Sequence, residues 1–146
     1  MEKISFDSGI KSYKINGTGV LRFNPGDPNV YARFLEAADK LQTVEAALAE
    51  EAKQLPQADG AAVVQLLNRA DREMKGILAW VFGEDNDFDK ILKGVNLLAV
   101  ADNGQRVVTN LLEALQPVLV EGAERCAMEK VDTAVQKARK RRGEAK

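Results

Sequence analysis

The spacing of apolar residues changes at one stretch of this sequence, Leu21-Arg22-Phe23-Asn24-Pro25-Gly26-Asp27-Pro28. Before it, apolar residues alternate with polar ones, as in a half-buried strand; after it, they recur every three or four residues, as in an amphipathic helix. Asp27 can accept hydrogen bonds from the free N–H groups of a first helical turn, and Pro28 suits that turn because its missing N–H would have no helical partner. A short β element is therefore predicted to lead directly into a long helix.

The β element comprises residues 1–24, where two or three short strands are predicted. The alternating apolar residues form three pairs, which are Ile4 and Phe6, Tyr13 and Ile15, and Leu21 and Phe23. Turns are expected at Ser8-Gly9 and at Gly17-Thr18-Gly19. The second turn is not a phosphate-binding loop, because such loops open a helix and this one leads into a strand. A lone hairpin is marginal in water, so the element is expected to pack on the helices.

Two long helices are predicted next, from about Pro28 to Gln54 and from about Ala61 to Phe82. Their apolar residues follow heptad steps and are Val30, Phe34, Ala37, Leu41, Val44 and Leu48, then Val63, Leu67, Ala70, Met74, Ile77 and Val81. Pro56 ends the first helix, and the short connection indicates an antiparallel helix hairpin. Each heptad face is either a core face or an open surface for a partner helix, and both interpretations remain open.

Further helices are expected in the second half of the chain. A short one over residues 87–93 would turn Phe88, Ile91 and Leu92 inward. A fourth would be capped by Asp102-Asn103-Gly104 and kinked or broken at Pro117, and its pattern fades into residues 137–142. The fold class is thus mainly α, with about four helices and an N-terminal β-hairpin or three-strand element. We expect residues 1–24 to pack on a helical domain, 25–136, followed by a basic, flexible tail, 137–146.

The composition favours a soluble cytoplasmic protein with no catalytic role. The chain has no histidine, which removes the commonest general base and metal ligand, and its single cysteine, Cys126, cannot form an internal disulfide. We predict neither a signal peptide nor a membrane-spanning segment. The net charge of −1 is unevenly distributed, because residues 125–146 carry +5 and the remainder −6.

An acidic run, Glu84–Asp89, invites comparison with a calcium-binding loop. Asp85, Asp87 and Asp89 have the spacing of its first ligands, but Lys90 stands where that loop needs glycine, and its last position is not glutamate. A helix-capping loop is therefore the preferred interpretation. No catalytic, cofactor-binding or metal-binding residue is predicted, and the protein is not expected to be an enzyme.

Binding to a partner is the remaining kind of function. Trp80 and Phe82 end the second helix, where they close the core or leave a ring exposed as a contact. The candidate partner-binding residues are Trp80, Phe82, Phe34 and Leu41. The basic run is either a solvated terminus or a phosphate-binding segment, and for nucleic acid the candidates are Arg139, Lys140, Arg141 and Arg142.

The order of these motifs resembles that of the tail assembly chaperones of long-tailed phages that infect Gram-positive bacteria. The matching features span about Ile4 to Glu124. They are the step Phe23–Pro28 followed by Tyr31–Leu35, the turn Val81-Phe82-Gly83-Glu84, the short helix Phe88–Leu92, and the segment Asn110–Pro117.

This resemblance implies a non-enzymatic role without a cofactor. Such proteins bind the long helical tape measure protein, keep it soluble and deliver it for assembly of the tail tube. The implied partners are therefore the tape measure protein, further copies of the chain, or a frameshifted longer form. The implied location is the cytoplasm of the bacterial host, and the protein is not expected in the mature virion. The alternatives are a small nucleic-acid-associated protein and a structural tail or head–tail component.

Overall fold

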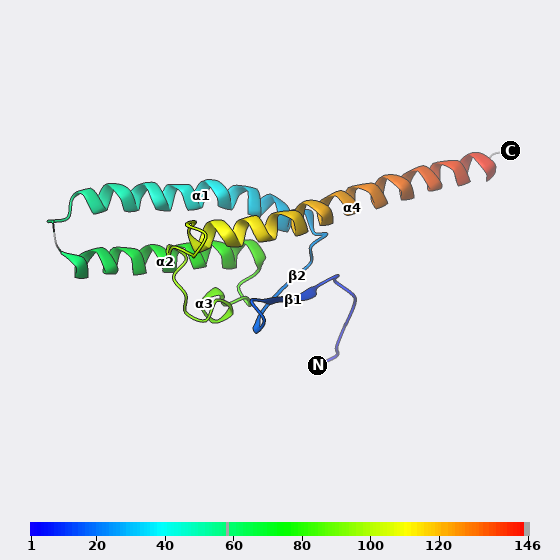
Figure 1. The fold of residues 1–146 in the computed structure, drawn as a ribbon. Helices are drawn as coiled ribbons and strands as arrows, with labels where there is room; N and C mark the ends of the chain where they lie inside the picture. The colour runs from blue at the N-terminus through cyan, green and yellow to red at the C-terminus, as the bar shows by residue number, and fades with distance from the viewer. Residues whose placement is uncertain (58, 145–146) are drawn as a thin grey trace.

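The computed structural model describes residues 1–57 and 59–144, with the backbone alone for residues 129–134 and 141–144. The chain is mainly α-helical with an N-terminal β-hairpin, which confirms the predicted fold class (Figure 1). In chain order, the strands and helices of the described residues are β1 (Lys11–Ile15), β2 (Gly19–Phe23), α1 (Pro28–Lys53), α2 (Gly60–Phe82), α3 (Phe88–Ile91) and α4 (Val107–Glu144).

The junction between β2 and α1 has the predicted chemistry. The Asp27 side chain accepts a hydrogen bond from the Asn29 N–H at 2.9 Å, and Pro28 is the first helical residue. One step earlier, the Asn24 side chain accepts from the Gly26 N–H at 2.8 Å. These bonds satisfy backbone donors that the turn and the first helical turn would leave free, so the strand ends and the helix begins within a few residues.

The β-hairpin has two antiparallel strands, with Tyr13 opposite Leu21. Its turn contains Asn16 and Gly17, whose φ values are 48° and 87°, as tight hairpin turns require. The side chains of Leu21 and Phe23 are buried. Residues 4–6 form no strand, so of the two predicted arrangements the hairpin is the one adopted.

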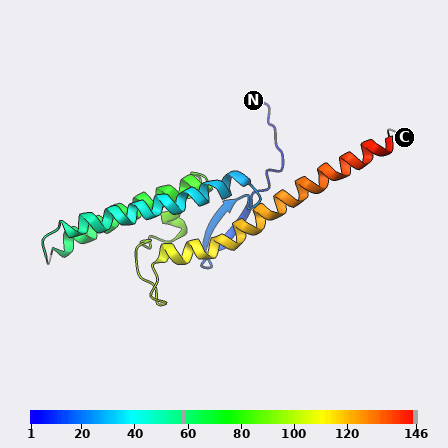
Figure 2. The same cartoon turned by 90° about the horizontal axis from the view of Figure 1, so that it is seen from above.

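The two long helices form the predicted antiparallel hairpin and share the core with α4 and the inner face of the β-hairpin (Figures 1 and 2). The heptad residues that α1 buries are Val30, Phe34, Ala37, Leu41 and Val44. They meet the apolar residues that α2 buries, which are Ala70, Met74, Leu78, Val81 and Phe82. The inward side chains predicted for the third helix, Phe88, Ile91 and Leu92, are buried as expected.

Helix α4 differs from its prediction at both ends and at its proline. It begins at Val107, because Asp102–Gly104 instead form a turn in which Asn103 accepts from the Gln105 N–H at 3.1 Å. It continues through the basic segment to Glu144, further than the sequence pattern indicated. It is also unbroken at Pro117. Proline has no N–H group, so the carbonyl of Glu113, one turn earlier, loses its helical donor. Both residues are exposed. Water can therefore bind that carbonyl, which reduces the usual cost of about 3 kcal/mol.

At Gly122, α4 lies directly against the turn that precedes α1. A Cβ atom at this position would lie 1.9 Å from the carbonyl oxygen of Pro25. Because the neighbour is backbone, Gly122→Ala has to push α4 away from the junction. We expect it to lower the free energy of unfolding by about 1–3 kcal/mol in chemical denaturation.

The matched control is Gly76→Ala, which adds the same methyl group to a helix. No atom lies within 4 Å of that position, so this change is expected to raise stability by about 0.5–1 kcal/mol. Equal effects of the two substitutions would contradict the close contact at Gly122.

Candidate functional site

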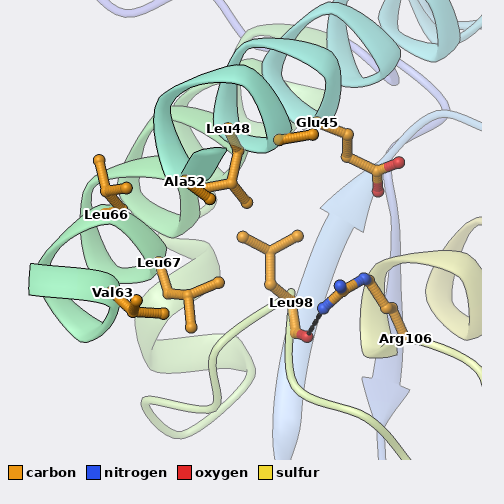
Figure 3. Close-up of a pocket in the computed structure, with 9 residues that line it drawn as sticks. Glu45, Leu48, Ala52, Val63, Leu66, Leu67, Leu98 and Arg106 are labelled. Carbon is orange, nitrogen blue, oxygen red and sulfur yellow. Dashed lines mark hydrogen bonds between the residues drawn. The ribbon is translucent and has the colours of Figure 1, made fainter. Parts of the chain in front are cut away.

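The heptad seam between α1 and α2 is covered near the middle of the molecule and open toward the loop that joins the two helices. Leu41 and Val44 are buried, whereas one turn further along α1 Leu48 is only half-buried. On α2, Val63 is exposed and Leu66 is half-buried. The open part forms a groove of about 350 Å³ (Figure 3). We call it the tip groove, and it is lined by Glu45, Leu48, Ala49, Ala52, Val63, Leu66, Leu67, Leu98 and Arg106.

One side of the tip groove comes from the segment between α3 and α4. Leu98 of this segment is buried, and its side chain points toward α1 and α2 in Figure 3. The guanidinium group of Arg106 donates a hydrogen bond to the Leu98 carbonyl oxygen. The backbone N–H of Val107 donates to the Ala99 carbonyl at 2.9 Å. These bonds hold the segment as a fixed wall at the start of α4.

The chemistry of the tip groove is that of an apolar binding surface. Most of its lining is leucine, valine and alanine, and the small side chains of Ala49 and Ala52 leave room for a partner to approach α1 closely. Glu45 on α1 and Arg106 next to α4 place one acidic and one basic side chain at the same end of the groove, away from Val63 and Leu66 (Figure 3). This combination suits an apolar side chain or helix face with flanking charges.

A buried ion pair fixes the segment that carries Leu98. The Lys75 Nζ atom lies 2.8 Å from Asp71 Oδ2 and 2.8 Å from Asp89 Oδ1. The other oxygen of Asp71 accepts from the Leu97 N–H at 2.7 Å. Burial alone would lower the pKa of Lys75, but the hydrogen bonds and charges of the two carboxylates outweigh it and raise this pKa above 10.5. Lys75 therefore ties α2 to α3 and, through Asp71, to the wall of the tip groove.

The acidic run 84–89 acts as the predicted capping loop. Asp87 is the N-cap of α3 and accepts hydrogen bonds from the N–H groups of Asp89 and Lys90 at 3.0 and 3.3 Å. The buried Asn86 side chain bonds the backbone of Arg22 on β2 and of Phe82 at the end of α2. Within the described residues, no cluster of three or more acidic or cysteine side chains is placed to hold a metal ion.

The predicted contact residues do not line the tip groove. Phe34, Leu41 and Phe82 are buried in the core, where a partner cannot reach them. Trp80 remains 38% exposed, with the Lys40 ammonium 3.8 Å from its ring centroid, but it lies at the opposite end of α2. The sequence did contain a signal for the groove, because Leu48, Val63 and Leu67 belong to the predicted heptad seam.

The basic candidates lie on the last turns of α4. The side chains of Arg139 and Lys140 are exposed, as is that of Lys137. The side chains of Arg141 and Arg142 lie outside the described residues. This part of α4 projects away from the rest of the molecule (Figures 1 and 2).

Comparison with known proteins identified no relative of this chain. The chain matches no family model, no curated protein and no solved structure. Among the described residues, no helix has the length and apolar character needed to cross a membrane.

Proposed function

We propose that this protein is a phage tail assembly chaperone, which binds apolar helical stretches of the tape measure protein before the tail tube forms around it. The observation that carries the proposal is the tip groove, an open apolar cleft between two antiparallel helices. A helix with an apolar face is the partner that such a cleft fits, because its side chains replace the missing part of the heptad seam. The order of sequence motifs supports the same assignment.

The size of the groove suggests how binding works on a long client. A cavity of about 350 Å³ holds few side chains, so each copy binds weakly. Many copies along one client act together, and they cover apolar stripes that would otherwise associate with one another. The charges of Glu45 and Arg106 at one end of the groove orient a client helix that carries complementary charges beside its apolar face.

The chaperone works in the cytoplasm of the bacterial host and is absent from the mature virion. A structural tail or head–tail component, in contrast, would be found in finished particles. Further copies of the chain, or a frameshifted longer form, share the client.

The test is co-expression with a tape measure protein, the large coiled-coil-rich client that the proposal expects from an adjacent gene. The soluble fraction of that client is expected to rise when the wild-type chain is present. Val63→Glu places a carboxylate in the tip groove, and we expect the soluble client to fall back to the level seen without the chaperone. If the wild-type chain leaves client solubility unchanged, the proposed function is wrong.

The matched control is Val64→Glu. Val64 is the next residue on α2 and is also exposed, but it does not line the tip groove. This variant is expected to behave as the wild type does. If neither variant loses the effect, or if both lose it equally, the effect does not depend on the tip groove.

Nucleic-acid binding is the second candidate, and the exposed Lys137, Arg139 and Lys140 favour it. Contacts of such residues to phosphates weaken steeply with salt and do not depend on base sequence. Deleting residues 137–146 separates the two candidates. The chaperone assignment expects client binding to survive this deletion, whereas a nucleic-acid function expects binding to be lost.

A further inference from the structure

The β-hairpin has one closed edge and one open edge. On the β2 side, the Asn86 side chain accepts from the Arg22 N–H and donates to the Arg22 carbonyl, both at 2.9 Å, as a neighbouring strand would. On the β1 side, no residue of the described chain pairs with the strand. The backbone groups of Arg22 point away from β1, so those of Ser12, which lies opposite, point away from β2 to the open edge. Backbone groups alternate along a strand, so those of Lys14, two residues further on and opposite Val20, point to the same edge.

An apolar cavity of about 490 Å³ adjoins β1, between the inner face of the hairpin and α4. Tyr13 and Ile15 of β1 are half-buried on this face. Phe23 of β2 and Leu111, Leu115 and Val118 of α4 form much of the rest of its apolar lining. A third strand on the open edge would place every second side chain over this cavity.

The N-terminal arm, residues 1–10, has the sequence of such a strand but is unpaired. Ile4 and Phe6 are 92% and 82% exposed, and polar residues alternate with them. Its first seven residues reach about 23 Å when extended, which exceeds the length of about 17 Å of the five-residue β1. The arm is therefore long enough to pair with the whole open edge.

The arm is held away from the open edge of its own copy. The Asn24 side chain donates to the Ser8 carbonyl at 3.0 Å, and the Asp7 carboxylate accepts from the Gly9 N–H at 2.8 Å. Gly9 has a φ of 75° and lies so close to Asn24 that a Cβ atom would be 2.6 Å from its Nδ2 atom. The arm thus continues past the end of β1 and leaves the body (Figures 1 and 2).

We propose that the N-terminal arm of one copy adds as a third strand to the open β1 edge of a second copy. In an antiparallel register, Ile4 lies opposite Ile15 and Phe6 opposite Tyr13, and both arm side chains cover the cavity beside α4. Aromatic and β-branched pairs of this kind stabilise a sheet.

The same register satisfies the polar groups of the edge. Ser5 lies opposite Lys14, and Asp7 lies opposite Ser12, so these residues exchange the backbone hydrogen bonds that the open edge lacks. The Asp7 carboxylate is then diagonal to the Lys14 ammonium on the outer face, which is a favourable pairing of charges. The lysines of β1 also disfavour addition of unrelated strands.

Disulfide trapping tests the register directly. In a Cys126→Ser background, Ser5→Cys and Lys14→Cys chains are purified separately, mixed and oxidised. Opposed strand residues have Cα atoms about 5.5 Å apart, which a disulfide bridges well. We expect a linked species containing one chain of each kind.

The control replaces Lys14→Cys by Arg22→Cys, which is exposed on the same hairpin but one strand further from the arm. This mixture is expected to yield no linked species, because the two positions exceed disulfide range. Equal trapping in both mixtures overturns the proposal. So does an internal disulfide in the Ser5→Cys/Lys14→Cys double variant without linked pairs, since the arm would then pair with its own edge.

Light scattering after size exclusion gives a second, independent readout. The wild-type chain is expected to associate as its concentration rises, with an average mass above the 16.0 kDa of one chain. Ile4→Asp/Phe6→Asp is expected to weaken this association at least about 100-fold, because two apolar side chains no longer become buried. Leu35→Asp/Val64→Asp changes two exposed apolar residues elsewhere and should leave it intact. A wild-type chain that stays monomeric at all concentrations contradicts the exchange.

Discussion

Lys75→Met is expected to lower the free energy of unfolding by about 3–5 kcal/mol, because it leaves the carboxylate of Asp71 buried without its cation. Lys75 and Asp71 have side chains only 8% and 11% exposed. The control is Lys53→Met, which breaks an ion pair with Glu50 whose side chains are about 70% exposed. That variant is expected to lose less than about 1 kcal/mol. Similar losses in chemical denaturation would mean that the Lys75 cluster contributes no more than a surface ion pair.

The same variant has an expected dependence on pH. The pKa of Lys75 is raised in the folded protein above its usual 10.5. The charged ammonium therefore contributes fully to folding stability below pH 10.5, and this contribution is lost as the pH rises through the higher pKa of the folded state. The stability difference between wild type and Lys75→Met should therefore be constant from pH 7 to 10 and shrink above about 10.5. A difference that does not shrink above about pH 10.5 would contradict the role of the Lys75 charge.

Asn86→Asp is expected to cost about 2–4 kcal/mol although the side chain keeps its size. The amide donates to the carbonyls of Arg22 and Phe82 at 2.9 and 3.0 Å, and a carboxylate has no proton to donate to either. The buried carbonyl of Phe82 and the partly buried carbonyl of Arg22 then lose this donor and face a negative charge. Because the native amide joins β2 to the end of α2, the loss should loosen the hairpin from the helices.

The measurement is urea denaturation at pH 7 and again near pH 4. Protonation of the introduced carboxyl restores one donor, so the loss relative to wild type should be smaller at the lower pH. Asn68→Asp, at an exposed position of α2, is the control and should change stability by less than about 0.5 kcal/mol. An Asn86→Asp loss no larger than this would rule out the bridging role of the amide.

The helix boundaries that depend on nearby residues could be predicted from the sequence. The change from alternating to heptad spacing, together with Asp27 and Pro28, located the start of α1 correctly. The end of α1 was predicted within one residue, because Pro56 and its neighbours disfavour a longer helix. Spacing and capping act over a few residues, so they can be evaluated without the tertiary structure.

The path of α4 could not be predicted in the same way. Pro117 carries a known cost in a helix interior, but the buried Leu111, Leu115 and Leu119 bind this helix to the core on both sides of the proline. Packing of that kind outweighs the local penalty, and it depends on elements distant in sequence. Residues outside the helix also determine where α4 starts, because Arg106 forms an isolated β-bridge with Val100 just before the first helical residue.

The candidate site was predicted only in part. The heptad seam was recognised, but which part stays open depends on where the segment carrying Leu98 crosses α2. Asp71 and Lys75 have the four-residue spacing of an ordinary surface pair, and only the approach of Asp89 and Leu97 makes them a buried anchor. The sequence therefore indicated an apolar face without showing its uncovered portion.

The contact between Gly122 and Pro25 also has a mechanical consequence. From Gly122 to Glu144, α4 extends about 33 Å as a helix that projects from the body. A tilt of about 10° at the contact moves the far end by about 6 Å. Small changes in packing at the start of α1 are thus magnified at the basic end of α4. The position of the basic end of α4 therefore depends on how closely Gly122 packs against Pro25.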